Sequence, residues 1–336
     1  MLLAKQGDEA AARAAFQRSA ATGEAEFAPK SAYELGFLLS KQGDVAGARA
    51  AYQQAIDSGH PKVAGPSAYE LAAMLDKQGD ASGARAAYQT AANSGHADLA
   101  PKAAHHLGWL LAKQSDDAGA VAAFRQAAAS GHAQIAPKAA FELAYLLNKQ
   151  GDVTGACAAY RQAVDAGDAE TAPKAAFELG EVLDALDDVA GARAAYQGAV
   201  DSGHEDMAPK AAFNLGCLLK RHDDVAGARA AYQRAVESGH AHWAPEGAYN
   251  LGWLLAELGD VPGARAAFQK AIDSGGSAVA PEAALSLGDL LADHGDLAGA
   301  RAAYQRAVAS GHEKWGPDAA ARLEGLAAAT VENIVG

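Results

Sequence analysis

The sequence predicts an all-α fold, an α-solenoid of about nine stacked helix-turn-helix repeats. Three observations point to this fold class. A 36-residue motif recurs from residue 29 to residue 316, apolar residues follow helical spacing inside each motif, and Pro and Gly stand where helices would begin and end. A fixed period of this length is typical of arrays in which each unit is too small to bury its apolar face alone and therefore packs on its neighbours.

The period can be followed in two columns of identical residues, and no unit carries an insertion. The first column consists of Asp8, Asp44, Asp80, Asp116, Asp152, Asp188, Asp224, Asp260 and Asp296. The second consists of Gly23, Gly59, Gly95, Gly131, Gly167, Gly203, Gly239, Gly275 and Gly311. We expect a single repeat domain over residues 1–336, with a truncated first unit at 1–28, eight full units at 29–316, and a C-terminal capping helix and tail at 317–336.

The first helix of a unit is expected near residues 29–42, and residues 1–5 match the end of such a helix. Pro29 suits the first helical position, because its missing N–H has no intrahelical role there. Leu35 and Leu39 recur at the spacing of one buried helical face. Gly43 then suits a left-handed residue that ends the helix.

The second helix is expected near residues 45–58. Asp44 is a natural N-cap for it, and Ala48 and Tyr52 belong to its buried stripe. Gly47 recurs inside this helix in later units, although Gly costs about 1 kcal/mol relative to Ala in a helix interior. We interpret it as a point of close approach between the two helices of a pair.

The repeat unit resembles a tetratricopeptide repeat, with Sel1-like repeats as a close relative. The residues that carry the resemblance, in the order and spacing of that family, are Leu35, Gly36, Leu39, Gly43, Ala48, Tyr52 and Ala55. The unit is longer than the usual length of roughly 34 residues, and its Pro opens the first helix instead of standing near the end of the second. The resemblance implies a right-handed superhelix, a concave groove lined by the first helices, and a role in binding proteins or peptides.

Composition disfavours several classes of partner. A formal net charge of -13 opposes binding to nucleic acid, whose phosphates need clustered Lys and Arg. The chain has no apolar run of membrane-spanning length, and residues 1–10 lack the regions of a signal peptide. We therefore expect no nucleic acid, no membrane and a cytoplasmic protein. Cys157 and Cys217 lack the spacing of a metal site or a disulfide framework.

No constellation of residues favours catalysis, so we expect a protein that is not an enzyme and uses no cofactor. In the acidic doublet of Asp116 and Asp117, the first member is the recurring N-cap. His60 and its loop equivalents would lie about 10 Å apart in stacked helix pairs, whereas zinc needs its ligands within about 2.1 Å. We therefore expect no metal site. The neighbours His105 and His106 point to different sides of a helix, and a ligand contact is their candidate role.

The candidate binding surface is a stripe on the first helices, opposite the face of Leu35 and Leu39. One column of this stripe varies while the core columns stay constant, and its candidate members are Phe37, Trp109, Tyr145, Glu181 and Trp253. Exposed aromatic residues suggest anchors for a ligand, and neutral drift on a solvated face is the alternative. A Lys column accompanies them, and its candidates for contact with acidic parts of a partner are Lys102, Lys138 and Lys174.

Charge along this stripe changes sign from one end of the chain to the other. The starts of the first helices carry Lys30, Lys102, Lys138, Lys174 and Lys210, and then acidic residues from Glu246 onward. The helix ends change in the same sense apart from Arg221. A helix dipole favours acid at the start and base at the end, so helix stability cannot explain both columns. A groove that is basic toward the N-terminus and acidic toward the C-terminus would orient an extended partner.

An Arg column on the outer side of the second helices, with Arg49 as an example, is expected to pair with acidic residues of the neighbouring unit. Val121 and Cys157 replace Arg in two adjacent units. The uncharged outer patch that results is an alternative docking surface.

The sequence thus favours a scaffold that binds a protein or peptide in its groove, alone or as the sensor part of a larger protein. One alternative is a protein that encloses a small aromatic ligand with Trp109, Tyr145 and Trp253. A second is a structural array that associates head to tail through apolar faces at its two ends, including the tail at 330–336. Contacts spread over several units would favour a peptide, and a compact enclosed pocket would favour a small molecule.

Overall fold

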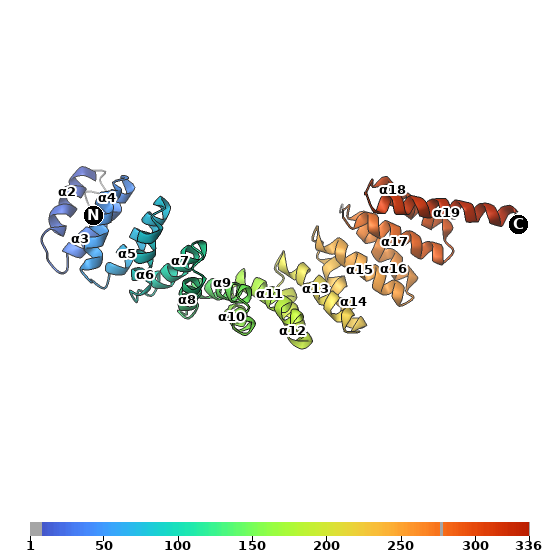
Figure 1. Ribbon diagram of the computed structural model, residues 1–336, viewed down its shortest axis with the longest axis horizontal. Coiled ribbons are helices and arrows are strands. Elements are labelled where there is room, and N and C mark those ends of the chain that lie inside the picture. Colours follow the sequence, from blue (N-terminus) through green and yellow to red (C-terminus); the bar gives the residue numbers. More distant parts are fainter. Residues whose placement is uncertain (1–8, 276–277, 336) are drawn as a thin grey trace. The chain divides into compact units, whose positions relative to one another are not determined.

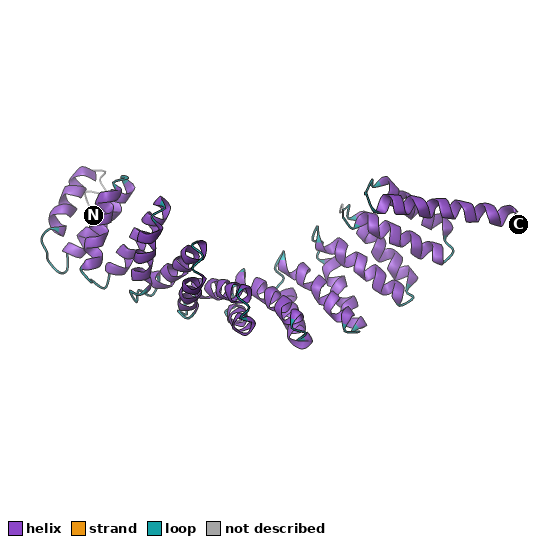
Figure 2. Ribbon diagram, in the orientation of Figure 1, coloured by secondary structure: helices purple, strands orange, loops and turns teal. Residues whose placement is uncertain are grey.

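The structure, a computed structural model, describes residues 9–275 and 278–335. Within these residues it contains eighteen helices and no strand, so the expected all-α fold is confirmed (Figure 2). The expected helix end at residues 1–5 and the expected N-cap Asp8 lie outside the described residues. None of the helices in the described ranges is long and apolar enough to cross a membrane.

The chain divides into two compact units, residues 1–172 and residues 173–336. In unit 1, every helix packs on the next one, and the first helices of consecutive repeats also contact each other (Figure 1). Its helices are α2 (Glu9–Ala20), α3 (Ala28–Lys41), α4 (Val45–Asp57), α5 (Ala64–Gln78), α6 (Ala81–Ala92), α7 (Leu99–Lys113), α8 (Asp117–Ala128), α9 (Ile135–Lys149) and α10 (Val153–Asp165). The first helices of unit 1 are α3, α5, α7 and α9.

Unit 2 repeats the same arrangement. The helix α11 (Thr171–Ala185) begins at the last two residues of unit 1 and lies mostly in unit 2. The others are α12 (Val189–Asp201), α13 (Met207–Arg221), α14 (Val225–Glu237), α15 (Trp243–Glu257), α16 (Val261–Asp273), α17 (Ala280–Asp293), α18 (Leu297–Ala309) and α19 (Trp315–Val335). The first helices α13, α15 and α17 contact one another in sequence, so their outward sides form one continuous surface. Side chains of the tail at 330–336 lie outside the described residues.

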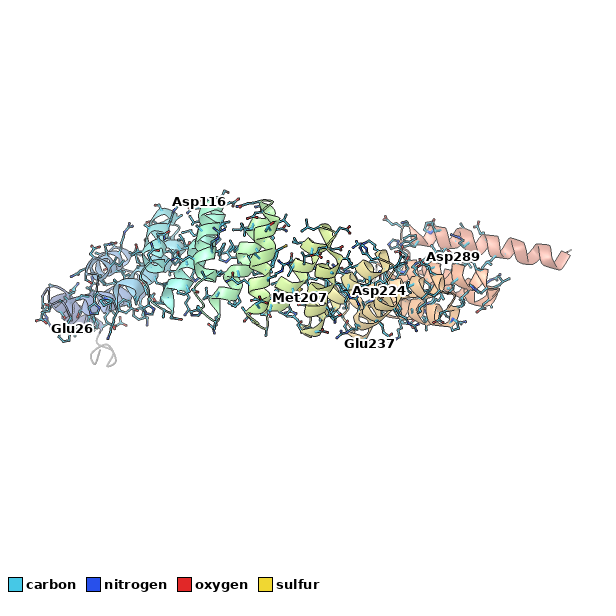
Figure 3. All side chains as sticks on the ribbon, turned by 90° about the horizontal axis from the view of Figure 1, so that it is seen from below. Glu26, Asp116, Met207, Asp224, Glu237 and Asp289 are labelled. Carbon is cyan, nitrogen blue, oxygen red and sulfur yellow. The ribbon has the colours of Figure 1, made fainter. Side chains whose placement is uncertain are left out.

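The second helices begin at the predicted Asp caps. The side chain of Asp44 accepts a hydrogen bond of 2.9 Å from the backbone N–H of Gly47. The equivalent bond is present at Asp116 and at Asp224, both labelled in Figure 3. Each cap satisfies a backbone donor that the first turn of a helix leaves without an intrahelical partner.

Left-handed residues separate the two helices of a pair, as the Gly column predicts. Gly43 has a φ of 77°, and the residues that replace Gly in this column, Ser115 and Asp223, keep φ values of 60° and 59°. The backbone therefore holds the same turn even where the side chain makes that conformation costly.

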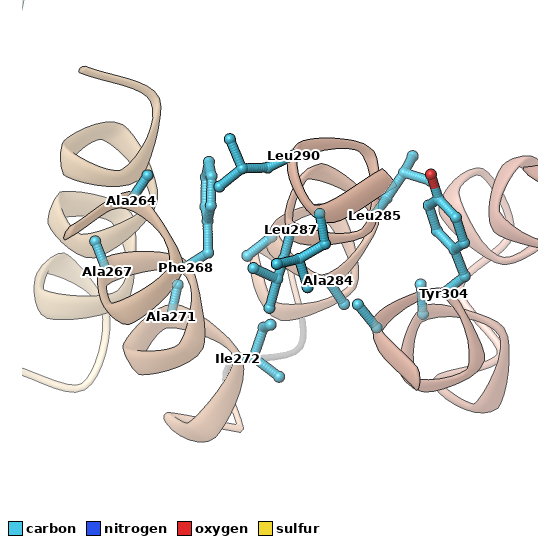
Figure 4. Close-up of a cluster of buried hydrophobic side chains, with 14 of the residues drawn as sticks. Ala264, Ala267, Phe268, Ala271, Ile272, Ala284, Leu285, Leu287, Leu290 and Tyr304 are labelled. Carbon is cyan, nitrogen blue, oxygen red and sulfur yellow. The ribbon is translucent and has the colours of Figure 1, made fainter. Parts of the chain in front are cut away.

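The core of each repeat is thin because a glycine or alanine of the first helix faces an aromatic ring of the second. A Cβ added to Gly36 would lie 2.6 Å from Cδ1 of Tyr52, and Tyr52 is almost completely buried. In unit 2, Phe268 of α16 and Leu290 of α17 point toward each other within one cluster of buried side chains (Figure 4). The burial comes from many small contacts rather than from one large core.

The interpretation of the Gly47 column as a point of helix–helix approach holds only in some repeats. A Cβ at Gly83 would lie 3.0 Å from Cδ1 of Leu75 in the paired first helix, and one at Gly227 would lie 2.9 Å from Cδ1 of Leu219. A Cβ at Gly47 would lie 2.7 Å from Oδ2 of Asp44, the N-cap of the same helix. Gly47 therefore makes room for its own cap. In this pair, the close approach between the helices falls at Gly36.

Ion pairs between consecutive repeats confirm the pairing expected for the Arg column. For example, Arg49 Nη1 lies 3.2 Å from Asp80 Oδ2. The same contact joins Arg13 to Asp44, Arg85 to Asp116, Arg193 to Asp224 and Arg265 to Asp296. These side chains are largely exposed, so each pair contributes about 0 to 1 kcal/mol. Val121 and Cys157 are themselves buried and add little surface to an outer docking patch.

Candidate functional site

The aromatic residues predicted as anchors lie on the outward side of the first helices. The exposed fractions are 40% for Phe37, 43% for Trp109, 54% for Tyr145 and 41% for Trp253. Glu181 is also exposed. We call the outward surface of the first helices in one unit, formed at the positions of Lys30, Phe37 and Lys41, the first-helix face. Exposed aromatic rings of this size are suited to contact with a partner.

Two of these rings are held in place by buried phenylalanines of the following helix. The Trp109 ring lies edge-on to Phe124, with centroids 5.9 Å apart and planes at 87°. Trp253 meets Phe268 with the same distance and angle. Edge-on ring pairs are favourable, so both indoles are oriented before any partner binds.

Phe37 differs from the other anchors because a cation of its own helix covers it. The Lys41 ammonium lies 4.5 Å from the centre of the Phe37 ring. In the described part of the chain, no Lys or Arg takes this place over Trp109, Tyr145 or Trp253. Their rings therefore offer more free surface to a partner than Phe37 does.

A column of half-buried and buried side chains beside the anchors was not predicted from the sequence. It stands four residues before the anchor column and consists of Tyr33, Tyr69, His105, Phe141, Phe177, Phe213, Tyr249 and Leu285. Most of these rings pack on the aromatic residue of the second helix, as Tyr69 does on Tyr88 at 6.1 Å. The signal that could have found it is the nearly unbroken run of aromatic residues at one position.

The Lys row is present on the face but is partly engaged within the chain. Lys102 pairs with Asp98 at 2.8 Å, four residues earlier on the same side. Lys138 is exposed and forms no ion pair within the described residues. Lys174 is half-buried at the equivalent position. Lys138 is accordingly the member of the row with the most freedom to contact a partner.

His106 contributes an aromatic ring to the face. Its imidazole stacks on the Tyr88 ring at 5.6 Å and 18° and lies 5.9 Å from Tyr69. Burial against these rings lowers the pKa of His106, and Asp76 opposes the shift. Burial lowers the pKa of His105 to about 4. Both side chains are therefore neutral near pH 7 and extend the aromatic surface of α5 and α7.

The carboxyl group of Glu142 in α9 has a raised pKa. Burial raises the pKa of Glu142 to about 7, and burial also raises the pKa of Glu70 and, together with Glu181, that of Glu178. Glu142 is thus only partly ionised near neutral pH. The face of α7 and α9, which carries Lys102 and Lys138, consequently loses little of its positive charge to this residue.

The loop histidines have a structural role. His132 Nδ1 accepts hydrogen bonds from the backbone N–H groups of Gln134 and Ile135, and its Nε2 lies 3.1 Å from Asp98 Oδ1 of the preceding loop. Asp168 takes the place of this histidine one repeat later and accepts a bond from Thr171 N–H. The ladder therefore caps first helices. In the described residues, no group of three or more His, Cys, Asp and Glu is arranged to hold a metal ion.

Cavities in unit 2 lie away from the predicted anchors. One of about 300 Å³ is lined by loop and helix residues that include His204, Pro209 and Arg234. Two others, of about 150 and 190 Å³, open between consecutive second helices. Trp253 lines none of these three cavities, so its ring belongs to an open surface and not to them.

A family model described as tetratricopeptide repeat matches residues 33–104, 105–171, 141–212, 213–279 and 249–316. These matches together cover well over half of the chain. The chain belongs to the tetratricopeptide repeat family. Comparison with curated proteins finds no matching sequence.

Two solved structures resemble this tetratricopeptide repeat chain. A Sel1 repeat protein from Oxalobacter formigenes is 20% identical with a TM-score of 0.54, over 90% of this chain and 87% of that one. The C-terminal part of a TPR repeat-containing protein from Cytophaga hutchinsonii is 16% identical with a TM-score of 0.52, over 75% of this chain and 98% of that one. At these identities the likeness concerns the fold alone. Both agree with a solenoid of tetratricopeptide or Sel1-like repeats, a fold that typically serves as a non-catalytic scaffold for protein interactions.

Proposed function

We propose that this chain is a non-enzymatic scaffold that binds an extended protein segment along its first-helix face. The observation that carries the proposal is the pair of exposed indoles, Trp109 and Trp253, each held edge-on by a buried phenylalanine. A preoriented aromatic side chain loses little conformational freedom on binding, and interface anchors of this kind often dominate affinity.

The spread of the anchors over several helices supports a peptide-like ligand. Trp109 and Tyr145 stand on the consecutive first helices α7 and α9, which contact each other. A segment that follows these helices meets one ring per repeat. A small aromatic ligand would instead need an enclosed pocket around the rings.

The proposal is tested by comparing variants of the full chain immobilised as bait in extract of the source cells. Proteins retained by the unchanged chain but lost with Trp109→Ala are purified, and their affinity is measured directly. We expect Trp109→Ala to weaken binding by tenfold or more, since anchors of this kind contribute about 2 kcal/mol or more. Lys138→Glu should mainly slow association and reduce its salt dependence.

Leu258→Ala provides the matched control. Leu258 is 52% exposed and stands at the end of α15, off the first-helix face. If this variant and Trp109→Ala change the affinity equally, the first-helix face is not the binding surface. Circular dichroism of each variant shows that its helices are intact.

A further inference from the structure

The first-helix face of α15 and α17 combines an aromatic platform with carboxylates. Glu246, Tyr249 and Trp253 follow the i, i+3, i+7 spacing that places side chains on one side of a helix. The Trp253 ring lies 6.5 Å from Tyr249, perpendicular to it. Glu282 joins them from α17, where its Oε1 accepts a hydrogen bond of 3.1 Å from the Tyr249 hydroxyl.

Two repeats earlier, the ring equivalent to Tyr249 carries a cation of its own. The ammonium group of Lys210 in α13 lies 3.9 Å from the centre of the Phe177 ring. The residues at the position of Lys210 in the next two repeats are Glu246 and Glu282. Carboxylates therefore replace the built-in cation, an aromatic ring is kept at the position of Tyr249, and Trp253 stands where the earlier repeats have Glu181 and Cys217.

These two carboxylates are not neutralised from within unit 2. Neither Glu246 nor Glu282 forms an ion pair with Lys or Arg in the described residues. By contrast, Glu257 pairs with Lys220 at 2.9 Å and Asp289 pairs with Arg322 at 3.2 Å. Burial and the charge of Glu282 raise the pKa of Glu246, and the nearby His242 opposes this shift. Negative charge without a Lys or Arg partner thus lies beside the platform.

We propose that the face of α15 and α17 binds a Lys or Arg side chain from a basic segment of the protein partner. The cation lies against the rings of Tyr249 and Trp253, and the carboxylates of Glu246 and Glu282 flank it. Aromatic faces attract cations, more strongly where water is excluded, and carboxylates add charge-assisted hydrogen bonds. This inference rests on the proposed function, because it assigns a ligand chemistry to one part of the same face.

The test uses the full chain and a fluorescein-labelled peptide of eight alternating Lys and Gly residues, with fluorescence anisotropy as the readout. The variant Glu246→Gln/Glu282→Gln keeps the side-chain size and removes two charges. We expect about tenfold weaker binding from the loss of these contacts. Trp253→Ala should weaken binding to a similar extent, and Trp253→Phe should retain most of it.

The control for general attraction to an acidic chain is Glu205→Gln/Glu313→Gln. It changes the net charge by the same amount at two exposed loop positions of unit 2. The inference predicts less than about twofold loss for this control, as expected for screened charges away from the site. Equal losses for the two double variants, or unchanged binding by Trp253→Ala, would overturn it.

Failure of this inference can be told apart from failure of the proposed function. If the double variants lose affinity for the Lys-Gly peptide equally while a purified partner still depends on Trp109, only the basic-segment assignment is wrong. If neither Trp109→Ala nor Trp253→Ala changes the partner's affinity, the first-helix face is not the binding surface.

Discussion

The two indoles of the first-helix face depend on their neighbours in each repeat. A Cβ at Gly252 would lie 2.6 Å from Cδ1 of Phe268, so this glycine allows the ring to approach and support Trp253. Where the anchor column holds a polar side chain, the second helix supplies a tyrosine, as Tyr304 does when its hydroxyl donates to Asp289 at 2.7 Å. In the two repeats with an indole anchor, the residue opposite the glycine is thus a phenylalanine that supports the indole.

The two carboxylates at the start of α8, Asp116 and Asp117, have different roles. Asp116 caps the helix through Gly119 N–H and pairs with Arg85, whereas Asp117 is only the first helical residue. We predict that Asp116→Ala lowers the free energy of unfolding by about 1 to 2 kcal/mol and that Asp117→Ala changes it by less than about 0.5 kcal/mol. Urea titration of both variants checks this, and equal losses would show that the cap is not the cause.

Glu142 gives a prediction about pH. Its pKa of about 7 in the folded chain exceeds the ordinary value of about 4.3, so the folded state binds more protons than the unfolded state between these values. Stability therefore falls as pH rises through this window. We predict that Glu142→Gln flattens the change in urea midpoint between about pH 5 and pH 8. A variant with the same pH profile as the unchanged chain would contradict this assignment.

At the scale of single residues, the sequence predicted the caps but not every contact. Asp44 and Gly43 act locally, so their roles follow from their places in the repeat. The role of Gly47 was predicted only in part, because the Asp side chain that caps the helix folds back onto this glycine. The aromatic column of Tyr69 and Tyr249 was missed because helical spacing alone does not distinguish a half-buried ring from a core ring.

At the scale of helices, α19 differs from the earlier first helices on the side with which those helices pack against a second helix. Glu324 occupies the position at which the earlier first helices place a small residue against the aromatic ring of the second helix. Those residues are Gly36, Ala72, Gly108, Ala144, Gly180, Gly216, Gly252 and Gly288. A Cβ at Gly288 would already lie 2.3 Å from Cε1 of Tyr304. The larger side chain of Glu324 at the equivalent position of α19 therefore leaves no room for such a ring. Glu324 is exposed, which suits a helix side in contact with water.

This residue bears on the head-to-tail alternative. We predict that Glu324→Gly strengthens self-association of the chain through the exposed side of α19. The substitution removes the charge and restores the small residue that the other first helices use to pack against a second helix. The expected result in multi-angle light scattering is a mass that rises with concentration for Glu324→Gly and stays lower for the unchanged chain at equal concentration. Identical masses for the two proteins would show that Glu324 does not control association.

The boundaries of the helices could be predicted within one or two residues, as α3 and α4 show against the expected 29–42 and 45–58. Local signals define them, namely Pro at the start, Gly at the turn and Asp at the cap. The division of the chain after residue 172 has no such signal, because the period runs through it without an insertion.

At the scale of the whole molecule, a repeat array should open from its ends. Each interior repeat packs on two neighbours and a terminal helix pair on one. We predict faster amide hydrogen exchange in α2 and α19 than in α7 or α15, measured by mass spectrometry of peptic fragments. Uniform protection along the chain would indicate that the array unfolds as one cooperative body.

The central claim is that partners bind the first-helix face, and its most direct test is the affinity of one purified partner for three variants. Trp109→Ala and Trp253→Ala change the face, whereas Arg229→Glu changes an exposed residue on the outer second helix α14. Isothermal titration calorimetry should show at least one Trp variant with affinity reduced by tenfold or more and Arg229→Glu close to the unchanged chain. If the affinity is unchanged in both Trp variants and falls with Arg229→Glu, the binding surface lies on the outer second helices instead.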